Sequence, residues 1–138
     1  MTRLFVAVDP PDHVRHRLTH AVPRPDEPGV RWVPPDRWHV TLRFLGEADE
    51  GAAAAAITRV RAPRAVATLG PRVARLGRSV VCLPVDGLNA LAEAVETATT
   101  GIGEPPDRRF RGHLTLARLR GRAACGVAGT AVSDAFEV

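Results

Sequence analysis

A four-residue pattern, histidine–apolar–threonine–apolar, occurs twice in this chain, at residues 39–42 and 113–116. Two of the five histidines begin this pattern, which chance alone rarely produces. Residues i and i+2 of a β-strand point to the same face. Each copy therefore predicts a strand that presents an imidazole and a hydroxyl on one face and buries apolar side chains on the other.

The segments before the two copies share a layout, which indicates an internal duplication. Each contains an apolar strand, an amphipathic helix, a proline-containing loop and a strand that opens with histidine. The predicted strands and helices are residues 4–8 and 12–22 in the first unit, and residues 79–85 and 88–102 in the second. Because short β-α-β units resemble one another anyway, the duplication rests mainly on the repeated tetrapeptide.

The remaining apolar periodicity predicts further strands and one more helix, so that residues 1–138 together form one α+β domain. It predicts strands at residues 32–33, 39–45, 65–69, 113–119 and 131–138, and a helix from residue 50 to about residue 61 that Asp49 caps. Strict alternation in the strand at 39–45 places Arg43 on the same face as His39 and Thr41.

Convergence of the two motifs would surround one small anionic group with two imidazoles and two hydroxyls. Imidazole exchanges protons near neutral pH, so a neutral histidine can act as the base while a protonated one acts as the acid. The threonine hydroxyls would hold non-bridging oxygens. This set of groups suits cleavage of a phosphodiester without a metal ion, although a single histidine in a strand is more often only a hydrogen-bonded residue.

The distribution of positive charge supports an anionic ligand. All 19 basic residues are arginine, and the absence of lysine excludes phosphate-loop and Schiff-base lysine chemistry. Within ten residues of the two motif histidines, nine arginines and five acidic residues give a balance of +4, which is the whole net charge of the chain. Arginine suits bidentate contacts to phosphate, but solvent-exposed loops would carry the same charge. Three aromatic residues in the same windows could stack on bases: Trp32, Trp38 and Phe110.

Other classes of site find little support. Cys82 and Cys125 form no C-x-x-C pair, so a cysteine-based zinc site is excluded and nothing requires a disulfide. Three further histidines lie at i, i+3 and i+7 on the first predicted helix: His13, His16 and His20. This spacing could hold a metal ion, but no carboxylate completes the set and two arginines lie among them, which favours a solvent-facing surface. No apolar run is long enough to span a membrane, and we expect a cytoplasmic protein.

The paired motifs resemble those of the two-histidine (2H) phosphoesterase superfamily. Three stretches are similar to its bacterial and archaeal RNA 2′,3′-cyclic phosphodiesterases (LigT-like): Arg3-Leu-Phe-Val-Ala-Val8, Trp38-His-Val-Thr-Leu-Arg-Phe-Leu-Gly46 and Phe110-Arg-Gly-His-Leu-Thr-Leu-Ala-Arg118. They follow in order along nearly the whole chain. The resemblance implies an α+β, bilobed and internally duplicated fold, with antiparallel-rich sheets lining a central cleft and helices outside.

The resemblance also implies hydrolysis of RNA 2′,3′-cyclic phosphate ends to 2′-phosphate, and reversible 2′-5′ RNA ligation as a related activity. With the chemistry of the motifs, it leads us to expect a reaction without metal ion or cofactor. By position, His39 would donate the proton to the leaving 3′-oxygen and His113 would be the base on water. Thr41 and Thr115 would bind phosphate oxygens, assisted by Arg118. Further candidate RNA-contacting residues are Arg43, Arg111, Trp38 and Phe110. The expected partner is RNA with a cyclic end, single-stranded or tRNA-like, with no membrane involved; the sequence leaves the oligomeric state open.

Three features of the chain qualify this expectation. Gly112 stands directly before the second histidine, where family members usually have proline. Members also usually continue through two more strands beyond Val138, so we expect one lobe to be short at its C-terminal end. Strict alternation places Arg118 opposite His113, so its role requires a β-bulge. Two alternatives remain: the same chemistry on another cyclic phosphate or a 2′-5′ oligonucleotide, and a catalytically impaired module that binds RNA ends.

Overall fold

Eight antiparallel strands and three α-helices make up the computed structural model, which describes residues 1–138. The strands are β1 (Thr2–Val8), β2 (Val30–Trp32), β3 (Val40–Ala48), β4 (Val66–Leu69), β5 (Ala74–Leu76), β6 (Val80–Asp86), β7 (His113–Leu119) and β8 (Asp134–Glu137). The helices are α1 (Asp12–Ala21), α2 (Glu50–Thr58) and α3 (Asn89–Ala98), with a short 3-10 helix, η1, at Pro35–Arg37. None of the helices is long and apolar enough to cross a membrane.

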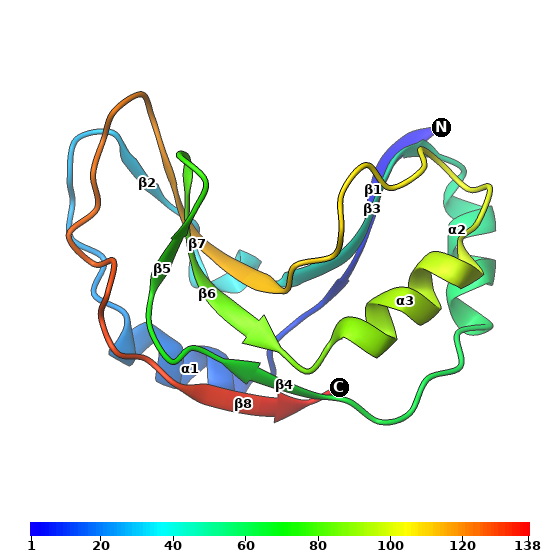
Figure 1. The fold of residues 1–138 in the computed structure, drawn as a ribbon, viewed down its shortest axis with the longest axis horizontal. Coiled ribbons are helices and arrows are strands. Elements are labelled where there is room, and N and C mark those ends of the chain that lie inside the picture. The colour runs from blue at the N-terminus through cyan, green and yellow to red at the C-terminus, as the bar shows by residue number, and fades with distance from the viewer.

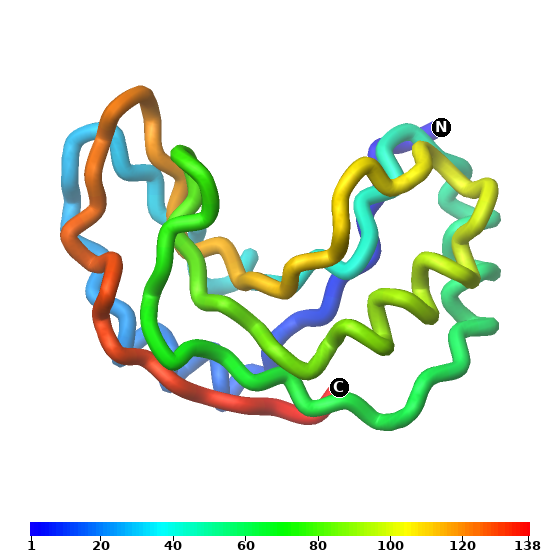
Figure 2. The backbone as a smooth tube through the Cα atoms, viewed as in Figure 1, coloured from blue at the N-terminus to red at the C-terminus, as the bar shows by residue number.

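The sheet has the order β1-β3-β7-β6-β4-β8, with β2 added to β7 and β5 added to β6. It curls so that the backbone forms a U whose concave side carries no helix (Figures 1 and 2). One arm of the U holds β1 and β3, and we call it the β1/β3 arm. The other arm holds β2 and the second half of β7, and we call it the β2/β7 arm. The bilobed, helix-outside arrangement expected from the resemblance is confirmed.

The internal duplication is visible in the strand pairing. Four of the seven pairs between β1 and β3 are Val8↔Val40, Ala7↔Thr41, Val6↔Arg43 and Phe5↔Phe44. Four of the five pairs between β6 and β7 are equivalent to them: Leu83↔Leu114, Cys82↔Thr115, Val81↔Ala117 and Val80↔Arg118. In both sets the second strand carries one extra residue at the same point, Leu42 in β3 and Leu116 in β7, which is a β-bulge. Each motif is therefore followed by a bulge that reverses which face the later side chains occupy.

The core lies between the helices and the convex face of the sheet. Val14 and Leu18 of α1 and Val95 of α3 belong to the same buried cluster as Val40 and Leu114 of the inner strands. The predicted cap of α2 is confirmed, because the Asp49 carboxylate accepts a hydrogen bond from the Ala52 amide. The apolar residues of the two motifs thus hold the inner strands to the core and leave their other face open.

The predicted element order is confirmed, and the differences have local causes. The sequence predicts no strand at β5, because its flanking Gly70-Pro71 and Gly77 suggest only loop. Apolar periodicity extends the third helix to residue 102, but α3 ends at Ala98 and Gly101 adopts a φ of 80°. The last strand begins at Asp134 rather than residue 131, because Ala131 makes only an isolated bridge to Arg72.

Candidate active site

The two motifs meet where β3 and β7 pair. Val40 pairs with Leu114, and each is the second residue of its motif. Continuing this antiparallel register by one residue in each direction places His39 opposite Thr115 and Thr41 opposite His113. Val40 and Leu114 are 0% exposed, whereas the four polar side chains are half-buried on the other, helix-free face. We call this face of β3 and β7 the site face.

Extended in this way, the register would place the four side chains at the corners of a small rectangle. The two imidazoles would then lie on one diagonal and the two hydroxyls on the other. Residues directly opposite in an antiparallel pair have Cβ atoms about 5 Å apart, and diagonal neighbours lie about 7–8 Å apart. A tetrahedral group between the corners would meet a hydroxyl on two sides and an imidazole on the other two.

Both imidazoles are oriented in the same way by the backbone. His39 Nδ1 lies 2.7 Å from the Arg37 carbonyl oxygen, and His113 Nδ1 lies 2.8 Å from the Arg111 carbonyl oxygen. A carbonyl only accepts, so each Nδ1 carries the proton and each Nε2 is left for a ligand. A neutral ring then offers a base at Nε2, and a protonated ring offers an acid at the same atom. The sequence gives no sign of these carbonyl partners, because any residue two positions earlier supplies one.

An aromatic pair, Phe5 and Phe44, lies beside His39, and the sequence pattern does not predict its place at the site. The rings of Phe5 and His39 stack with centroids 5.0 Å apart and an interplanar angle of 28°. Phe5 pairs with Phe44, and the two side chains are 51% and 48% exposed. The Arg3 guanidinium lies 5.3 Å from the centroid of the Phe44 ring. Both phenylalanines belong to stretches that resemble the family, and the exposure of Phe44 follows from the bulge at Leu42.

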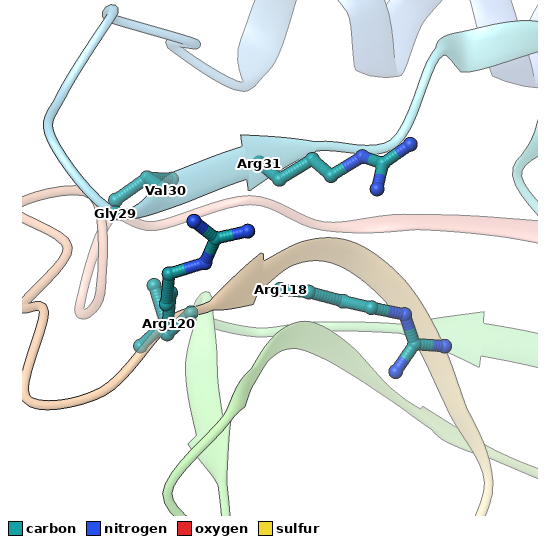
Figure 3. A pocket seen from close by; sticks show the side chains of 6 residues that line it. Gly29, Val30, Arg31, Arg118 and Arg120 are labelled. Atoms are coloured by element: carbon teal, nitrogen blue, oxygen red, sulfur yellow. The ribbon is translucent and has the colours of Figure 1, made fainter.

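The bulge at Leu116 brings Arg118 to the site face. Thr115 is half-buried, Leu116 and Ala117 are both buried, and Arg118 is exposed, so the alternation shifts by one residue. The required β-bulge between His113 and Arg118 is therefore confirmed. Arg118 pairs with Arg31 of β2, and both line a hollow of about 520 Å³ with Gly29, Val30, Leu119 and Arg120 (Figure 3).

The matching bulge in β3 turns Arg43 away from the site, so the prediction that it shares the face of His39 is wrong. Its side chain is 6% exposed. Its guanidinium donates hydrogen bonds to the Phe44 carbonyl at 2.9 Å, to Thr99 Oγ1 at 3.4 Å and to the Ile102 carbonyl at 3.5 Å. Arg43 joins β3 to the end of α3 and is not available to an RNA ligand.

Trp38 is also a core residue rather than an RNA contact. It is 1% exposed, and its indole Nε1 donates a hydrogen bond to the Val33 carbonyl at 3.0 Å. The sequence could not separate this role from stacking, because a tryptophan beside a strand serves either purpose. Trp32 is half-buried and its Nε1 donates to the Pro25 carbonyl at 2.8 Å.

Two other candidate contacts lie near the site in different ways. The Arg111 side chain is exposed, and its carbonyl orients His113. Phe110 is half-buried against the core and lines a hollow of about 300 Å³ beside Phe44. That hollow also contains acidic residues: Glu96, Glu104 and Asp107.

Gly112 allows a close approach of the backbone at the start of β7. The Val85 amide donates a hydrogen bond to the Gly112 carbonyl at 2.9 Å, and a Cβ at position 112 would lie 2.3 Å from the Val85 oxygen. A side chain there would therefore push β6 and β7 apart beside His113. Further along this pair, Cys82 faces Thr115, and burial raises the pKa of its thiol.

The other potential ligands do not gather around this site. His13, His16 and His20 lie on α1, at the convex side, where His20 Nδ1 is 2.9 Å from the His16 carbonyl. No group of three or more histidine, cysteine, aspartate or glutamate side chains is placed to hold a metal ion.

Comparisons with known proteins agree with this geometry. The sequence model of the LigT-like phosphoesterase family matches residues 8–69. The RNA 2′,3′-cyclic phosphodiesterase of Escherichia coli (strain K12) is 36% identical over 126 residues, which cover 84% of this chain and 71% of that protein. The chain belongs to the LigT-like phosphoesterase family. A second relative, the RNA 2′,3′-cyclic phosphodiesterase of Archaeoglobus fulgidus, is 31% identical over 133 residues, covering 86% of this chain and 73% of that protein.

Solved structures of this family have the same fold. The crystal structure of E. coli LigT in its apo form superposes with a TM-score of 0.76 at 29% identity, covering 99% of this chain and 82% of that chain. The crystal structure of E. coli LigT complexed with 3′-AMP gives a TM-score of 0.69 at 31% identity, covering 96% and 81%. The resemblance to two-histidine phosphoesterases drawn from the motifs is thereby confirmed, and the chain is a phosphodiesterase-family enzyme.

Proposed function

We propose that this LigT-like phosphoesterase hydrolyses RNA 2′,3′-cyclic phosphate ends to 2′-phosphate ends. The observation that carries the proposal is the pairing of Val40 with Leu114, which brings the two motifs together with each histidine Nδ1 at a backbone carbonyl and each Nε2 left for a ligand. The two relatives named RNA 2′,3′-cyclic phosphodiesterase support the choice of substrate.

The proposed reaction uses the two histidines as a matched base and acid. His113 Nε2 takes a proton from water, whose oxygen attacks the phosphorus of the cyclic phosphate. The bond from phosphorus to the 3′-oxygen breaks, and His39 donates its Nε2 proton to that oxygen. The products are a 2′-phosphate monoester and a free 3′-hydroxyl. The Phe5 ring supports this assignment, because an aromatic face interacts favourably with a cationic ring.

Neutral and cationic donors stabilise the charge that develops on phosphorus. Thr41 and Thr115 donate hydroxyl hydrogens to the non-bridging oxygens, and Arg118 contributes a positive charge from the same face. After turnover His39 is neutral and His113 is protonated, so solvent must exchange one proton with each ring. Both rings are half-exposed, which gives solvent access for that exchange.

Two further properties follow from the same chemistry. A 5′-hydroxyl of a second RNA in place of water would give a 2′-5′ phosphodiester, which is the proposed ligation. The reaction also proceeds without a metal ion or cofactor, because acid, base and phosphate ligands all come from the chain. We expect the substrate to be a single-stranded or tRNA-like end, and the enzyme to act in the cytoplasm.

The product of a defined substrate tests the proposal. An RNA ending in a 2′,3′-cyclic phosphate is incubated with the enzyme, and the end group is identified by phosphorus NMR. A 2′-phosphate is expected from the wild type, and His39→Ala and His113→Ala should each lose turnover by about 100-fold or more. Binding of this RNA without product would instead favour an RNA-end-binding module. Turnover of a different cyclic phosphate or of a 2′-5′ oligonucleotide alone would move the proposal to that substrate.

A further inference from the structure

Four arginines with no acidic partner line the β2/β7 arm. They are Arg31, Arg37, Arg118 and Arg120. Two hollows of about 520 Å³ and 310 Å³ adjoin there, and Arg31 and Arg118 line both of them. Figure 3 shows Arg31 and Arg118 extending in the same direction from β2 and β7, with Arg120 at the end of β7. This arm is therefore a strongly cationic surface beside the site.

The pairing of Arg31 with Arg118 is unfavourable unless an anion lies nearby. The two residues are directly opposite on neighbouring strands, where like charges destabilise a sheet. The ion pairs of the chain are Arg15–Asp12 and Arg17–Asp134, so no carboxylate neutralises this arm. The fold thus places two arginines opposite each other with no salt bridge to either side chain.

The cationic residues continue the line of the site face. Along β7, His113, Thr115 and Arg118 follow one another on this face, because the bulge at Leu116 brings Arg118 back to it. Arg120 follows just beyond the end of the strand and lines the same hollow as Arg118. Two residues of a strand advance by roughly 6.6 Å. Arg118 and Arg120 therefore extend from the cyclic phosphate position in regular steps, and Arg31 lies across from the first of them.

The β1/β3 arm offers a different surface at the equivalent positions. Phe44 stands where β7 has Arg118, and Phe5 stands where β6 has Val80. The hollow beside Phe44 contains acidic residues as well as Arg108. Phosphates are therefore favoured on the β2/β7 arm, where no acidic residue lines either hollow, and this difference breaks the symmetry of the duplicated fold.

We propose that Arg31 and Arg120 bind the phosphates on the 5′ side of the cyclic end, so that the enzyme selects RNA strands over cyclic mononucleotides. This inference rests on the proposed function. A 2′,3′-cyclic phosphate is the 3′ terminus of its strand, so the strand leaves the site only in the 5′ direction. The first upstream phosphate lies at Arg31, beyond Arg118 and the cyclic phosphate, and the second lies at Arg120. Bidentate guanidinium contacts suit each of them.

Substrate length and single substitutions test this subsite together. The substrates are a mononucleotide, a dinucleotide and a trinucleotide, each ending in a 2′,3′-cyclic phosphate, and the readout is the ratio of kcat/KM between successive lengths. For the wild type we expect a gain of roughly tenfold for each added phosphate. The logarithm of kcat/KM should also fall more steeply with the logarithm of salt concentration, by about 0.7 per phosphate bound.

The variants separate the two phosphate positions. Arg31→Gln should bring the dinucleotide-to-mononucleotide ratio close to one, whereas Arg120→Gln should preserve that ratio and remove the further gain of the trinucleotide. Arg64→Gln removes the same charge from an exposed loop outside both hollows and should preserve both gains. Ratios within one variant cancel any general loss of activity.

The outcomes distinguish this inference from the proposed function. Length dependence that survives Arg31→Gln and Arg120→Gln, or that Arg64→Gln reduces equally, overturns the subsite. If the wild type turns over none of the three substrates, the proposed function fails. Fluorescence anisotropy with a labelled trinucleotide that ends in 2′-phosphate then decides the subsite. The subsite requires weaker binding by Arg31→Gln and Arg120→Gln than by Arg64→Gln, and equal binding by all three rejects it.

Discussion

The close approach of Gly112 to Val85 predicts how sensitive the site is to a single methyl group. In Gly112→Ala the new Cβ would lie 2.3 Å from the Val85 oxygen, whereas ordinary van der Waals contact begins near 3.4 Å. The backbone must therefore move by roughly 1 Å, and the adjacent residue is His113. Misplacement of a catalytic group by about 1 Å reduces a rate by roughly 100-fold. We expect a fall of that size in kcat for hydrolysis of a cyclic-phosphate RNA, with a smaller change in KM.

Gly126→Ala is the matched control, because its new Cβ would have no neighbour closer than 4.0 Å and should leave kcat unchanged. Thermal melting of both variants shows whether they are folded at the assay temperature. Gly112→Pro adds the same Cβ and should be at least as impaired, although family members usually have proline here. A folded Gly112→Ala variant with wild-type kcat would refute the reasoning that this contact positions His113.

Further predictions concern the ion pair of β8 and the aromatic contact of the site. Arg17 donates two hydrogen bonds to the Asp134 carboxylate, at 2.9 and 2.7 Å, and these bonds hold the pKa of Asp134 below its usual value. The ion pair therefore stabilises the fold at neutral pH, and this stabilisation is lost as the pH falls through the pKa of Asp134 in the folded protein. Because the Arg17 side chain is solvent-exposed, Asp134→Asn should lower the melting temperature by a few degrees at most at neutral pH. An equal difference in melting temperature between the variant and the wild type at acid pH would contradict this expectation. Phe5→Leu removes a ring contact worth about 0.5–1.5 kcal/mol and should lower kcat about two- to tenfold, whereas Phe44→Leu, which does not stack on His39, should change kcat less. Equal effects of both substitutions on kcat would show that the stacking on His39 has no role.

The sequence predicts what depends on local pattern. Alternation in each motif places Val40 and Leu114 in the core and the histidines and threonines on the other face, because strand geometry is set residue by residue. The repeated motif likewise predicts the duplication that the strand registers show. These features need no knowledge of which strands become neighbours.

What the sequence does not predict depends on pairing between distant segments. The bulges at Leu42 and Leu116 exist only relative to β1 and β6, and they decide that Arg43 is buried while Arg118 is exposed. The stacking of Phe5 on His39 joins two strands, and so does the pairing of Arg31 with Arg118. The burial of Trp38 is also not predictable from the local sequence, because it depends on how the whole core packs around the indole.

The pH dependence of kcat/KM, measured on a cyclic-phosphate RNA in the presence of a chelator, tests the central claim most directly. Acid–base catalysis by two histidines without a metal ion predicts a bell-shaped profile that the chelator leaves unchanged. Replacing either His39 or His113 by alanine should abolish the profile together with the turnover. Loss of activity in the chelator, or full activity of His113→Ala, would contradict the account.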